Sequence, residues 1–281
     1  MTVLVTGASG FIGNHLIQLL LKKGHTVVAT STNELKAKSF DWYQKVSYKE
    51  FELGPQKTEV NLFNFFGNPD LLIHLAWRGL PNYDELYHLK DNLISQFFFL
   101  ENLINGGLKD LLITGSCLEY GMQNGCLNES METKPINSYG VAKDTLRKLM
   151  ESLQLNYTFS LKWVRLFYMY GEGQSSKSLF SQLNKAIEEN EAIFNMSAGE
   201  QIRDFLPVKK VIEIIYLIAI QNEVQGVINC CSGKPVSVRK LVEDYLKEKK
   251  SLINLNLGYY PYPTYEPLAF WGDSKKINSI T

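Results

Sequence analysis

The chain of 281 residues lacks an excess of charge of either sign, because 29 basic residues balance 29 acidic residues. A balanced chain gives no electrostatic reason to expect nucleic acid or an anionic membrane as a partner. It also lacks a long apolar run, since the most apolar stretch, 211–220, is about ten residues long and contains Glu213. We therefore expect a buried helix there and no membrane span. The absence of a basic leader at the N-terminus favours a cytoplasmic protein.

Cysteine is scarce, and Cys117, Cys126, Cys230 and Cys231 follow no C-x-x-C spacing. A disulfide between the adjacent Cys230 and Cys231 would be strained. We expect reduced thiols, as is usual in the cytoplasm. The same spacing predicts no metal site.

A glycine-rich turn near the N-terminus is the strongest local signal. The apolar run 3–5 is typical of a strand covered on both faces, and a helical pattern follows the turn up to Lys23. Between them, Gly7 permits a tight turn, Gly10 lets the backbone approach a ligand, and Gly13 lets the helix pack closely on the strand. Because the helix directs its free N–H groups at this turn, the sequence predicts a pyrophosphate site. A purely structural turn is the alternative.

Strand and helix patterns alternate over roughly the first two thirds of the chain, which is typical of a doubly wound parallel sheet. The expected strands after the first span 26–30, 46–53, 71–76, 111–114 and 160–167, and the main helices span 14–23, 83–105 and 138–153. From about Gly171 the pattern changes. We predict an α/β protein with a Rossmann-type NAD(P)-binding domain in 1–170. Residues 171–281 would form mainly a small C-terminal substrate-binding lobe, with elements returning to the sheet.

The end of the second strand bears on the choice of cofactor. A dinucleotide site usually has an acid there to hold the ribose 2′-hydroxyl, whereas this chain has Ser31, with Lys36 and Lys38 downstream. An absent carboxylate removes repulsion against a 2′-phosphate. We therefore expect NADP(H) to be preferred and NAD(H) to be accepted. Alternatively, Ser31 merely begins a loop and both cofactors bind.

Three residues have the chemistry of a carbonyl reductase. Ser116 follows the fifth strand at the edge where ligands bind in such sheets, and Tyr139 and Lys143 lie one turn apart on one helix face. Lowering a tyrosine pKa from ~10 to ~7 takes about 4 kcal/mol, which a cation ~4 Å away in a partly dry site supplies. Tyr139 would then exchange a proton with a substrate oxygen held by Ser116. An exposed helix pair is the alternative for Tyr139 and Lys143.

Several motifs, in their order along the chain, resemble an extended short-chain dehydrogenase/reductase. They point to the NAD-dependent epimerase/dehydratase family, in its nucleotide-sugar 4-ketoreductase branch. The motifs are Thr6 to Gly13, His74-Leu75-Ala76, Asn92, Ser116 with Tyr120-Gly121, Tyr139 to Lys143, and Arg203-Asp204-Phe205.

The resemblance implies a role for each matched residue. Tyr139 would be the general acid/base, Lys143 would lower its pKa and hold the nicotinamide ribose, and Ser116 would orient the reacting oxygen. Glu52 would lie near the adenine. The implied cofactor residues are Gly7, Ser9, Gly10, Phe11, Ile12, Gly13, Ser31, Glu52, Leu53, Leu75, Ala76, Trp77, Asn92, Tyr139 and Lys143.

Substrate contacts are expected from three residues. By resemblance, Arg203 would bind the diphosphate of a nucleotide sugar, and a salt bridge with a carboxylate is the alternative. Trp77 and Tyr83 would touch the sugar, and a plain loop with aromatic packing is an equal alternative.

Departures from the family pattern narrow the reaction. Cys117 and Leu118 stand where sugar 4,6-dehydratases carry an acid pair, and the histidine of epimerase-reductases of the GDP-fucose synthase type is missing. A ketoreductase and a 4-epimerase both remain open. The short chain favours an NADPH-preferring reductase of a nucleotide-activated 4-keto-6-deoxyhexose, such as dTDP-4-keto-6-deoxyglucose, in surface-sugar biosynthesis. The alternatives are a 4-epimerase that retains NAD and a non-catalytic nicotinamide-binding sensor. We also expect a homodimer paired through helices 83–105 and 138–153, with the apolar cluster 97–100 at the interface.

Overall fold

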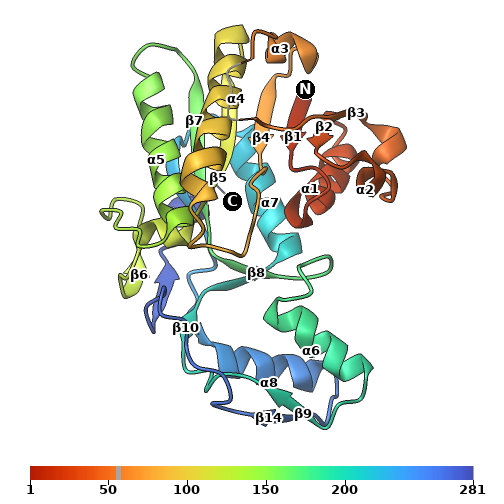
Figure 1. Ribbon diagram of the computed structural model, residues 1–281, viewed down its shortest axis with the longest axis vertical. Helices are drawn as coiled ribbons and strands as arrows, with labels where there is room; N and C mark the ends of the chain where they lie inside the picture. Colours follow the sequence, from red (N-terminus) through yellow and green to blue (C-terminus); the bar gives the residue numbers. More distant parts are fainter. Residues whose placement is uncertain (55–57, 281) are drawn as a thin grey trace.

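A seven-stranded parallel sheet forms the centre of the computed structural model, which describes residues 1–54 and 58–280 (Figure 1). Its strand order is β12-β7-β5-β4-β1-β2-β3. The sheet is built outward from β1 on both sides, as in a doubly wound sheet. The strands are β1 (Thr2–Thr6), β2 (Thr26–Ser31), β3 (Ser47–Glu50), β4 (Leu71–His74), β5 (Asp110–Ser116), β7 (Ser160–Leu166) and β12 (Gly226–Cys230). The predicted α/β fold is confirmed.

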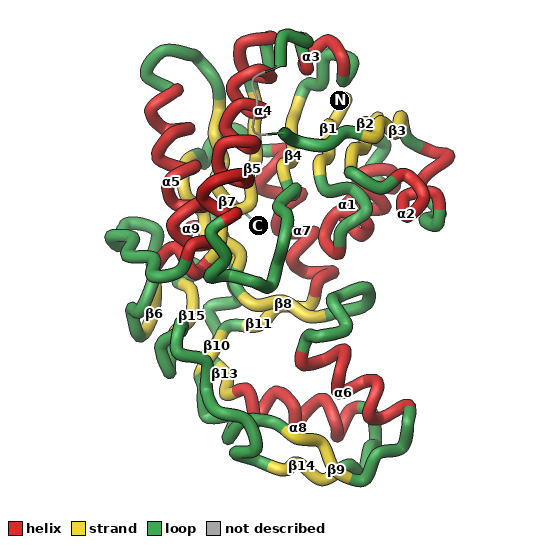
Figure 2. Tube along the Cα trace, viewed as in Figure 1, coloured by secondary structure: helices red, strands yellow, loops and turns green. Residues whose placement is uncertain are grey.

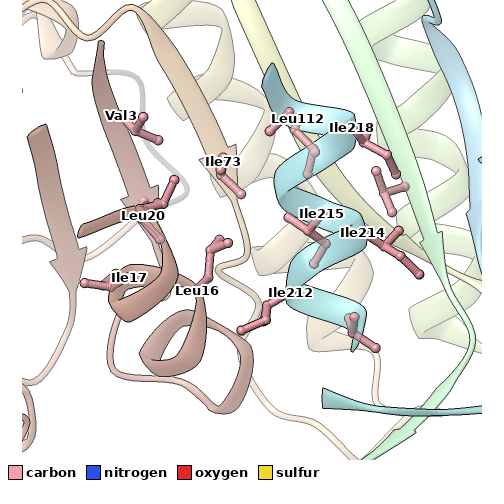
Figure 3. Packing of buried hydrophobic residues seen from close by; sticks show 14 of the residues in the cluster. Val3, Leu16, Ile17, Leu20, Ile73, Leu112, Ile212, Ile214, Ile215 and Ile218 are labelled. Atoms are coloured by element: carbon pink, nitrogen blue, oxygen red, sulfur yellow. The ribbon is translucent and has the colours of Figure 1, made fainter. Parts of the chain in front are cut away.

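Helices cover both faces of this sheet. They are α1 (Phe11–Lys22) and α7 (Val208–Ile220) on one face, and α3 (Leu62–Phe65), α4 (Leu93–Gly106) and α5 (Ser138–Leu153) on the other. Side chains along β1 alternate between the two layers, because successive residues of a strand point to opposite faces. Val3 therefore belongs to one apolar cluster with Leu16 and Ile215 (Figure 3), whereas Leu4 belongs to a second cluster with Leu100 on the other face.

Residues 171–205 and 231–269 contribute an outer lobe with its own apolar core. Phe180 and Leu183 of α6 (Leu179–Glu188) pack against Val242 and Leu246 of α8 (Val238–Glu248). A two-stranded pair of β9 (Ile193–Asn195) and β14 (Asn254–Asn256) closes this lobe. Between these two segments, the chain returns to the central layers as α7 and β12.

Three further strand pairs connect the central layers to the outer lobe. These are β8 (Tyr168–Tyr170) with β11 (Phe205–Pro207), β10 (Ile202–Arg203) with β13 (Val236–Ser237), and β6 (Gly125–Leu127) with β15 (Phe270–Gly272). The remaining short helices are α2 (Glu34–Lys38) and α9 (Lys275–Asn278), and α9 packs on β12.

The helix expected over 83–105 begins later than predicted. Residues 75–87 form an irregular loop (Figure 2), one turn of π-helix follows as η2 (His88–Asn92), and α4 starts at Leu93. The loop backbone makes a few turns of its own and also bonds to the neighbouring helix. The Tyr139 N–H donates to the Tyr83 carbonyl at 2.9 Å, and the Ser138 hydroxyl donates to the Asp84 carbonyl at 2.9 Å.

Two features are absent from residues 1–54 and 58–280. No helix there combines the length and the apolar character that crossing a bilayer requires. In the same residues, His, Cys, Asp and Glu side chains form no group of three that could hold a metal ion.

Candidate active site

The turn between β1 and α1 is as tight as its glycines suggest. Gly7 has φ of +66°, a left-handed conformation that favours glycine. A Cβ on Gly13 would lie 2.3 Å from the Gly7 carbonyl oxygen, so no larger residue fits without moving the backbone. Gly10 precedes α1 without a capping side chain, which leaves first-turn N–H groups available to an anion.

A cavity of about 230 Å³ opens beside this turn, at the carboxyl ends of β1, β2 and β4. Most of the expected cofactor residues line it, namely Gly7, Ser9, Gly10, Ser31, Glu52, Leu53, Leu75, Ala76, Trp77 and Asn92. Gly7 and Gly10 also line a second cavity of about 430 Å³, together with Phe11, Ile12, Gly13 and Tyr139. The two cavities, joined at an uncapped helix start, fit a bound dinucleotide.

The adenosine end of the first cavity is polar. Ser9 Oγ donates to Ser31 Oγ at 2.9 Å, and Ser31 Oγ also bonds to the Tyr48 hydroxyl at 2.8 Å. Glu52, from the segment after β3, contributes a carboxylate to the same cavity and pairs with Arg78 at 3.0 Å. Residue 31 supplies no acid, but the cavity still contains one. Lys36 and Arg78 line the same cavity, so its charges alone do not decide between NAD(H) and NADP(H).

The structure brings Ser116, Tyr139 and Lys143 together. Ser116 is the last residue of β5 and Tyr139 is the second residue of α5, and both line the second cavity. Lys143 is buried beneath that cavity, where its Nζ donates to the Thr114 carbonyl at 2.8 Å and lies 4.0 Å from the centre of the Trp77 indole. The alternative of an exposed pair on a helix surface is excluded, because Tyr139 and Lys143 are both buried.

The pKa of Tyr139 is not lowered in this structure, contrary to our expectation. Burial raises the pKa of this phenol above its usual range, while the Ser116 hydroxyl acts in the opposite direction. The Lys143 ammonium lies 6.0 Å from the Tyr139 ring centre. Burial also lowers the pKa of Lys143 to about 7.

A buried acid that the sequence did not reveal holds the Ser116 backbone. Glu119 accepts the Ser116 N–H at 2.8 Å, the Trp163 indole N–H at 3.0 Å and the Arg165 Nε at 2.7 Å. All of these groups are buried. Glu119 is therefore committed to fixing the end of β5 and is not directed at the cavity.

On the substrate side, Arg203 is already paired. Its Nη2 donates to Glu266 at 2.9 Å, and its Nη1 donates to the carbonyls of Ile202 and Leu268. Glu266 also accepts a hydrogen bond from the Tyr168 hydroxyl. Tyr168 and Glu266 line both the second cavity and an outer cavity of about 530 Å³. The alternative of a salt bridge for Arg203 is thus what the structure shows, with Glu266 as the carboxylate.

The two expected aromatic contacts lie at the reaction end. The Tyr83 ring centre is 5.6 Å from that of Tyr139 and 5.6 Å from that of Tyr265. Trp77 meets the Tyr139 ring edge-on at 5.7 Å and lines both the first and the second cavity. The Asn92 amide nitrogen, by contrast, forms hydrogen bonds with the Arg78 carbonyl and with His88.

Comparison with known proteins agrees with this geometry. The family described as "NAD dependent epimerase/dehydratase family" matches residues 3–231. A protein of Aggregatibacter actinomycetemcomitans, dTDP-6-deoxy-L-talose 4-dehydrogenase (NAD(+)), is 31% identical over 273 residues, which are 97% of this chain and 99% of that protein. GDP-6-deoxy-D-talose 4-dehydrogenase of the same organism is 28% identical, over 86% of this chain and 78% of that protein.

Among solved structures, MoeE5 in complex with UDP-glucuronic acid and NAD is similar to this chain with a TM-score of 0.83 at 25% identity. The match covers 100% of this chain and 92% of that one. UDP-glucuronic acid 4-epimerase of Bacillus cereus in complex with NAD, at 24% identity and a TM-score of 0.82, shares the fold over 100% of this chain and 90% of that one.

Proposed function

Because this chain belongs to the NAD-dependent epimerase/dehydratase family, we propose that it interconverts the 4-keto and 4-hydroxy forms of a nucleotide-activated 6-deoxyhexose. The observation that carries this proposal is the convergence of Ser116, Tyr139 and Lys143 on a cavity joined to the glycine turn. The names of two relatives, both 4-dehydrogenases of 6-deoxytaloses, support the choice of C4 and of a 6-deoxy sugar.

In the direction of reduction, Tyr139 is the proton donor. Its raised pKa keeps the phenol protonated at neutral pH, so that it donates to the carbonyl oxygen that Ser116 holds. The buried Lys143 ammonium then stabilises the phenolate that remains. NADH, when bound, supplies the hydride that reduces the carbonyl carbon.

The cofactor of this proposal is NAD(H). The 31% identical relative is named for NAD(+), and Glu52 places a carboxylate in the cavity that the adenosine ribose would enter. The absence of an acid at Ser31 favours NADP(H) instead, so both coenzymes have to be measured side by side. Gly7, Gly10 and the first turn of α1 would hold the pyrophosphate.

The test measures absorbance at 340 nm with purified protein. The substrates are dTDP-6-deoxy-L-talose with NAD⁺ or NADP⁺, and dTDP-4-keto-6-deoxyglucose with NADH or NADPH. Stoichiometric coenzyme turnover that Tyr139→Phe abolishes supports the proposal, and the better coenzyme decides between NAD and NADP. Sugar isomerisation without net coenzyme turnover, together with NAD released on denaturation, would indicate a 4-epimerase instead. Bound coenzyme with neither reaction would favour the sensor.

We also propose a homodimer paired through α4 and α5. Phe97 and Phe98 on α4 are only half-buried within one chain, and Ile94 of the same helix is 37% exposed. Apolar side chains on an outer helix face gain free energy when a second copy covers them. Light scattering should give twice the 32.1 kDa chain mass, and Ile94→Glu with Phe98→Glu should return it to the single mass.

A further inference from the structure

His88 is the centre around which the loop 75–87 is folded. Its side chain is buried, with no exposed surface. The imidazole Nδ1 lies 3.0 Å from the Trp77 indole nitrogen and 3.1 Å from the Asn92 amide nitrogen. The other ring nitrogen, Nε2, lies 2.9 Å from the Asn82 carbonyl oxygen. Both ends of the ring are therefore occupied.

These contacts determine which nitrogen carries the proton. The Trp77 indole N–H only donates. The Asn92 atom near His88 also lies 3.0 Å from the Arg78 carbonyl oxygen, which only accepts, so this atom is the amide NH₂. Because Nδ1 faces two donors, it is unprotonated. Because Nε2 faces a carbonyl, it carries the hydrogen, and the imidazole is neutral.

Trp77 transmits this arrangement to the residues of the proposed chemistry. Its indole face lies 4.0 Å from Lys143 Nζ, and its edge meets the Tyr139 ring. The Thr114 carbonyl is the hydrogen-bond acceptor of the same ammonium. In a dry site the negative face of an indole stabilises a cation more strongly than in water. The acceptor on His88 sets the rotation of the indole and thus what covers Lys143.

We infer that His88 is a positioning residue for the Tyr139–Lys143 pair, and that it acts through its unprotonated Nδ1, which holds Trp77 over the ammonium. The inference rests on the proposed function only in giving that pair the catalytic work. A protonated His88 would set a third N–H against the donors of Trp77 and Asn92, so the arrangement requires the neutral ring.

The surroundings of His88 favour the neutral ring. Burial lowers its pKa, and the Lys143 ammonium on α5 acts in the same direction. The Asn82 carbonyl and Glu85, both in the loop before η2, act in the opposite direction. The remaining neighbours are aromatic: Tyr87 precedes it at 4.4 Å and Tyr139 on α5 meets it at 5.4 Å between ring centres.

The first experiment needs no substrate. Protein labelled with ¹⁵N-histidine contains only four imidazoles, and His88→Asn assigns the signal of interest. We expect the Nε2–H tautomer, with no titration between pH 8 and about 6.5, the ordinary histidine pKa. An Nδ1–H tautomer, or titration at the ordinary pKa, would overturn the inference. This result stands even if no tested sugar is turned over.

The second experiment separates positioning from simple support of the fold. His88→Phe keeps a ring but removes the acceptor, whereas His88→Asn keeps an acceptor near the place of Nδ1. His88→Phe should move the alkaline limb of the kcat profile about one pH unit lower, because a desolvated cation–π contact is worth about one pKa unit. His88→Asn should leave the limb in place. NADH titration, followed by its fluorescence, reports whether cofactor binding weakens in parallel.

Two further variants complete the design. Trp77→Phe removes the indole donor, and His88→Phe should add little to it if the histidine acts through Trp77. His25→Asn, in the turn between α1 and β2, is the matched control. It should change neither the alkaline limb of the kcat profile nor the affinity for NADH. If His88→Phe lowers the melting temperature but leaves the alkaline limb unmoved, His88 only supports the fold and the positioning role is rejected.

Discussion

The cofactor cavity and the outer cavity are built in different ways. The first is lined by the ends of neighbouring strands of one sheet, and the contacts of its glycine turn are made by backbone atoms. The outer cavity is lined by side chains from remote segments, including Pro81, Lys177, Arg203 and Tyr265. On the proposed function, sheet register would position the coenzyme, whereas packing between distant segments would select the substrate.

The two cavities also differ in the burial of their ion pairs. Glu52 and Arg78, at the mouth of the cofactor cavity, form an exposed pair, and such pairs contribute little to stability. Arg203 and Glu266, at the outer cavity, form a buried pair with side chains only 3% and 10% exposed. Breaking a buried pair leaves one charge uncompensated. Changes on the outer side should therefore affect folding as well as binding.

The largest effect should come from Tyr139→Phe, in the second cavity, which shares lining residues with both the cofactor cavity and the outer cavity. Loss of the proton donor should lower kcat between about a hundred- and ten-thousandfold. Coenzyme and nucleotide affinities should both stay close to those of the wild type, because neither cavity is rebuilt. Steady-state rates with NADH fluorescence titrations measure both quantities. Tyr157→Phe, which alters an exposed tyrosine after α5, is the control, and retained turnover in Tyr139→Phe would contradict the assignment.

Gly13→Ala should damage the glycine turn beside the cofactor cavity and spare the outer cavity. Its Cβ would meet the Gly7 carbonyl, and overpacking of about 1–3 kcal/mol corresponds to about a five- to 150-fold loss of NADH affinity. Affinity for dTDP, whose diphosphate we expect at Arg203 in the outer cavity, should hold. Calorimetric titration with each ligand separates the two. Gly54→Ala adds a Cβ in open space and should bind NADH normally. An equal loss of dTDP affinity in Gly13→Ala would erase the distinction between the cavities.

The pH dependence should follow Lys143. Burial lowers the pKa of this ammonium to about 7, and the charged form is the one that stabilises the phenolate. The value of kcat/KM should therefore fall about tenfold per unit as pH rises above that pKa. Lys143 does not line the outer cavity, so binding of dTDP there should not follow this limb. A profile that stays level from pH 7 to 9 would show that the charge on Lys143 is not required.

Glu266→Gln should affect the outer cavity and spare the cofactor cavity. Removing the carboxylate charge leaves the Arg203 guanidinium free to attract phosphate, and we expect dTDP to bind about tenfold more tightly. The melting temperature should fall, because the buried cation loses its counter-charge. Glu200→Gln, on the exposed surface nearby, is the control. Weaker dTDP binding in Glu266→Gln would show that Arg203 is a structural residue and not a phosphate ligand.

The smallest effect should come from Ser31→Asp. A second carboxylate beside Glu52 should weaken NADP(H) binding by about 1 kcal/mol, or about fivefold, and leave NAD(H) binding nearly unchanged. Dissociation constants for all four coenzyme forms measure the change. Ser31→Asn, which adds a similar volume without charge, controls for packing. If both substitutions weaken NADP(H) equally, charge at this position does not select the coenzyme.

Local rules explain what the sequence predicted well. The helix α5 spans Ser138–Leu153 as expected, because Asn137 caps it by accepting the Gly140 N–H at 2.7 Å. The turn around Gly7 was equally readable, since strand, glycines and helix all lie within a short stretch of sequence. In both cases, the determining contacts join residues close in the chain.

Long-range pairing explains what the sequence did not reveal. The partners Arg203 and Glu266 are 63 residues apart, and the Tyr168 hydroxyl reaches Glu266 across 98 residues. The late start of α4 had the same origin, because the carbonyl of Tyr83 bonds to α5. His88 carries no motif at all, and its neutral state follows only from the donors that surround it. The spacing of apolar residues along the chain reveals none of these long-range contacts.

The two excursions that form the outer lobe begin and end at neighbouring points. The chain leaves β8 after Tyr170 and returns at β11, which pairs with β8. It leaves again near Cys231 and returns at Gly272, where an added Cβ would meet the Cys231 side chain at 2.5 Å. Because the ends of each excursion lie close together, the central sheet would tolerate insertions or deletions in 171–204 and 232–269. Because the two excursions share one apolar core, they would have to change together.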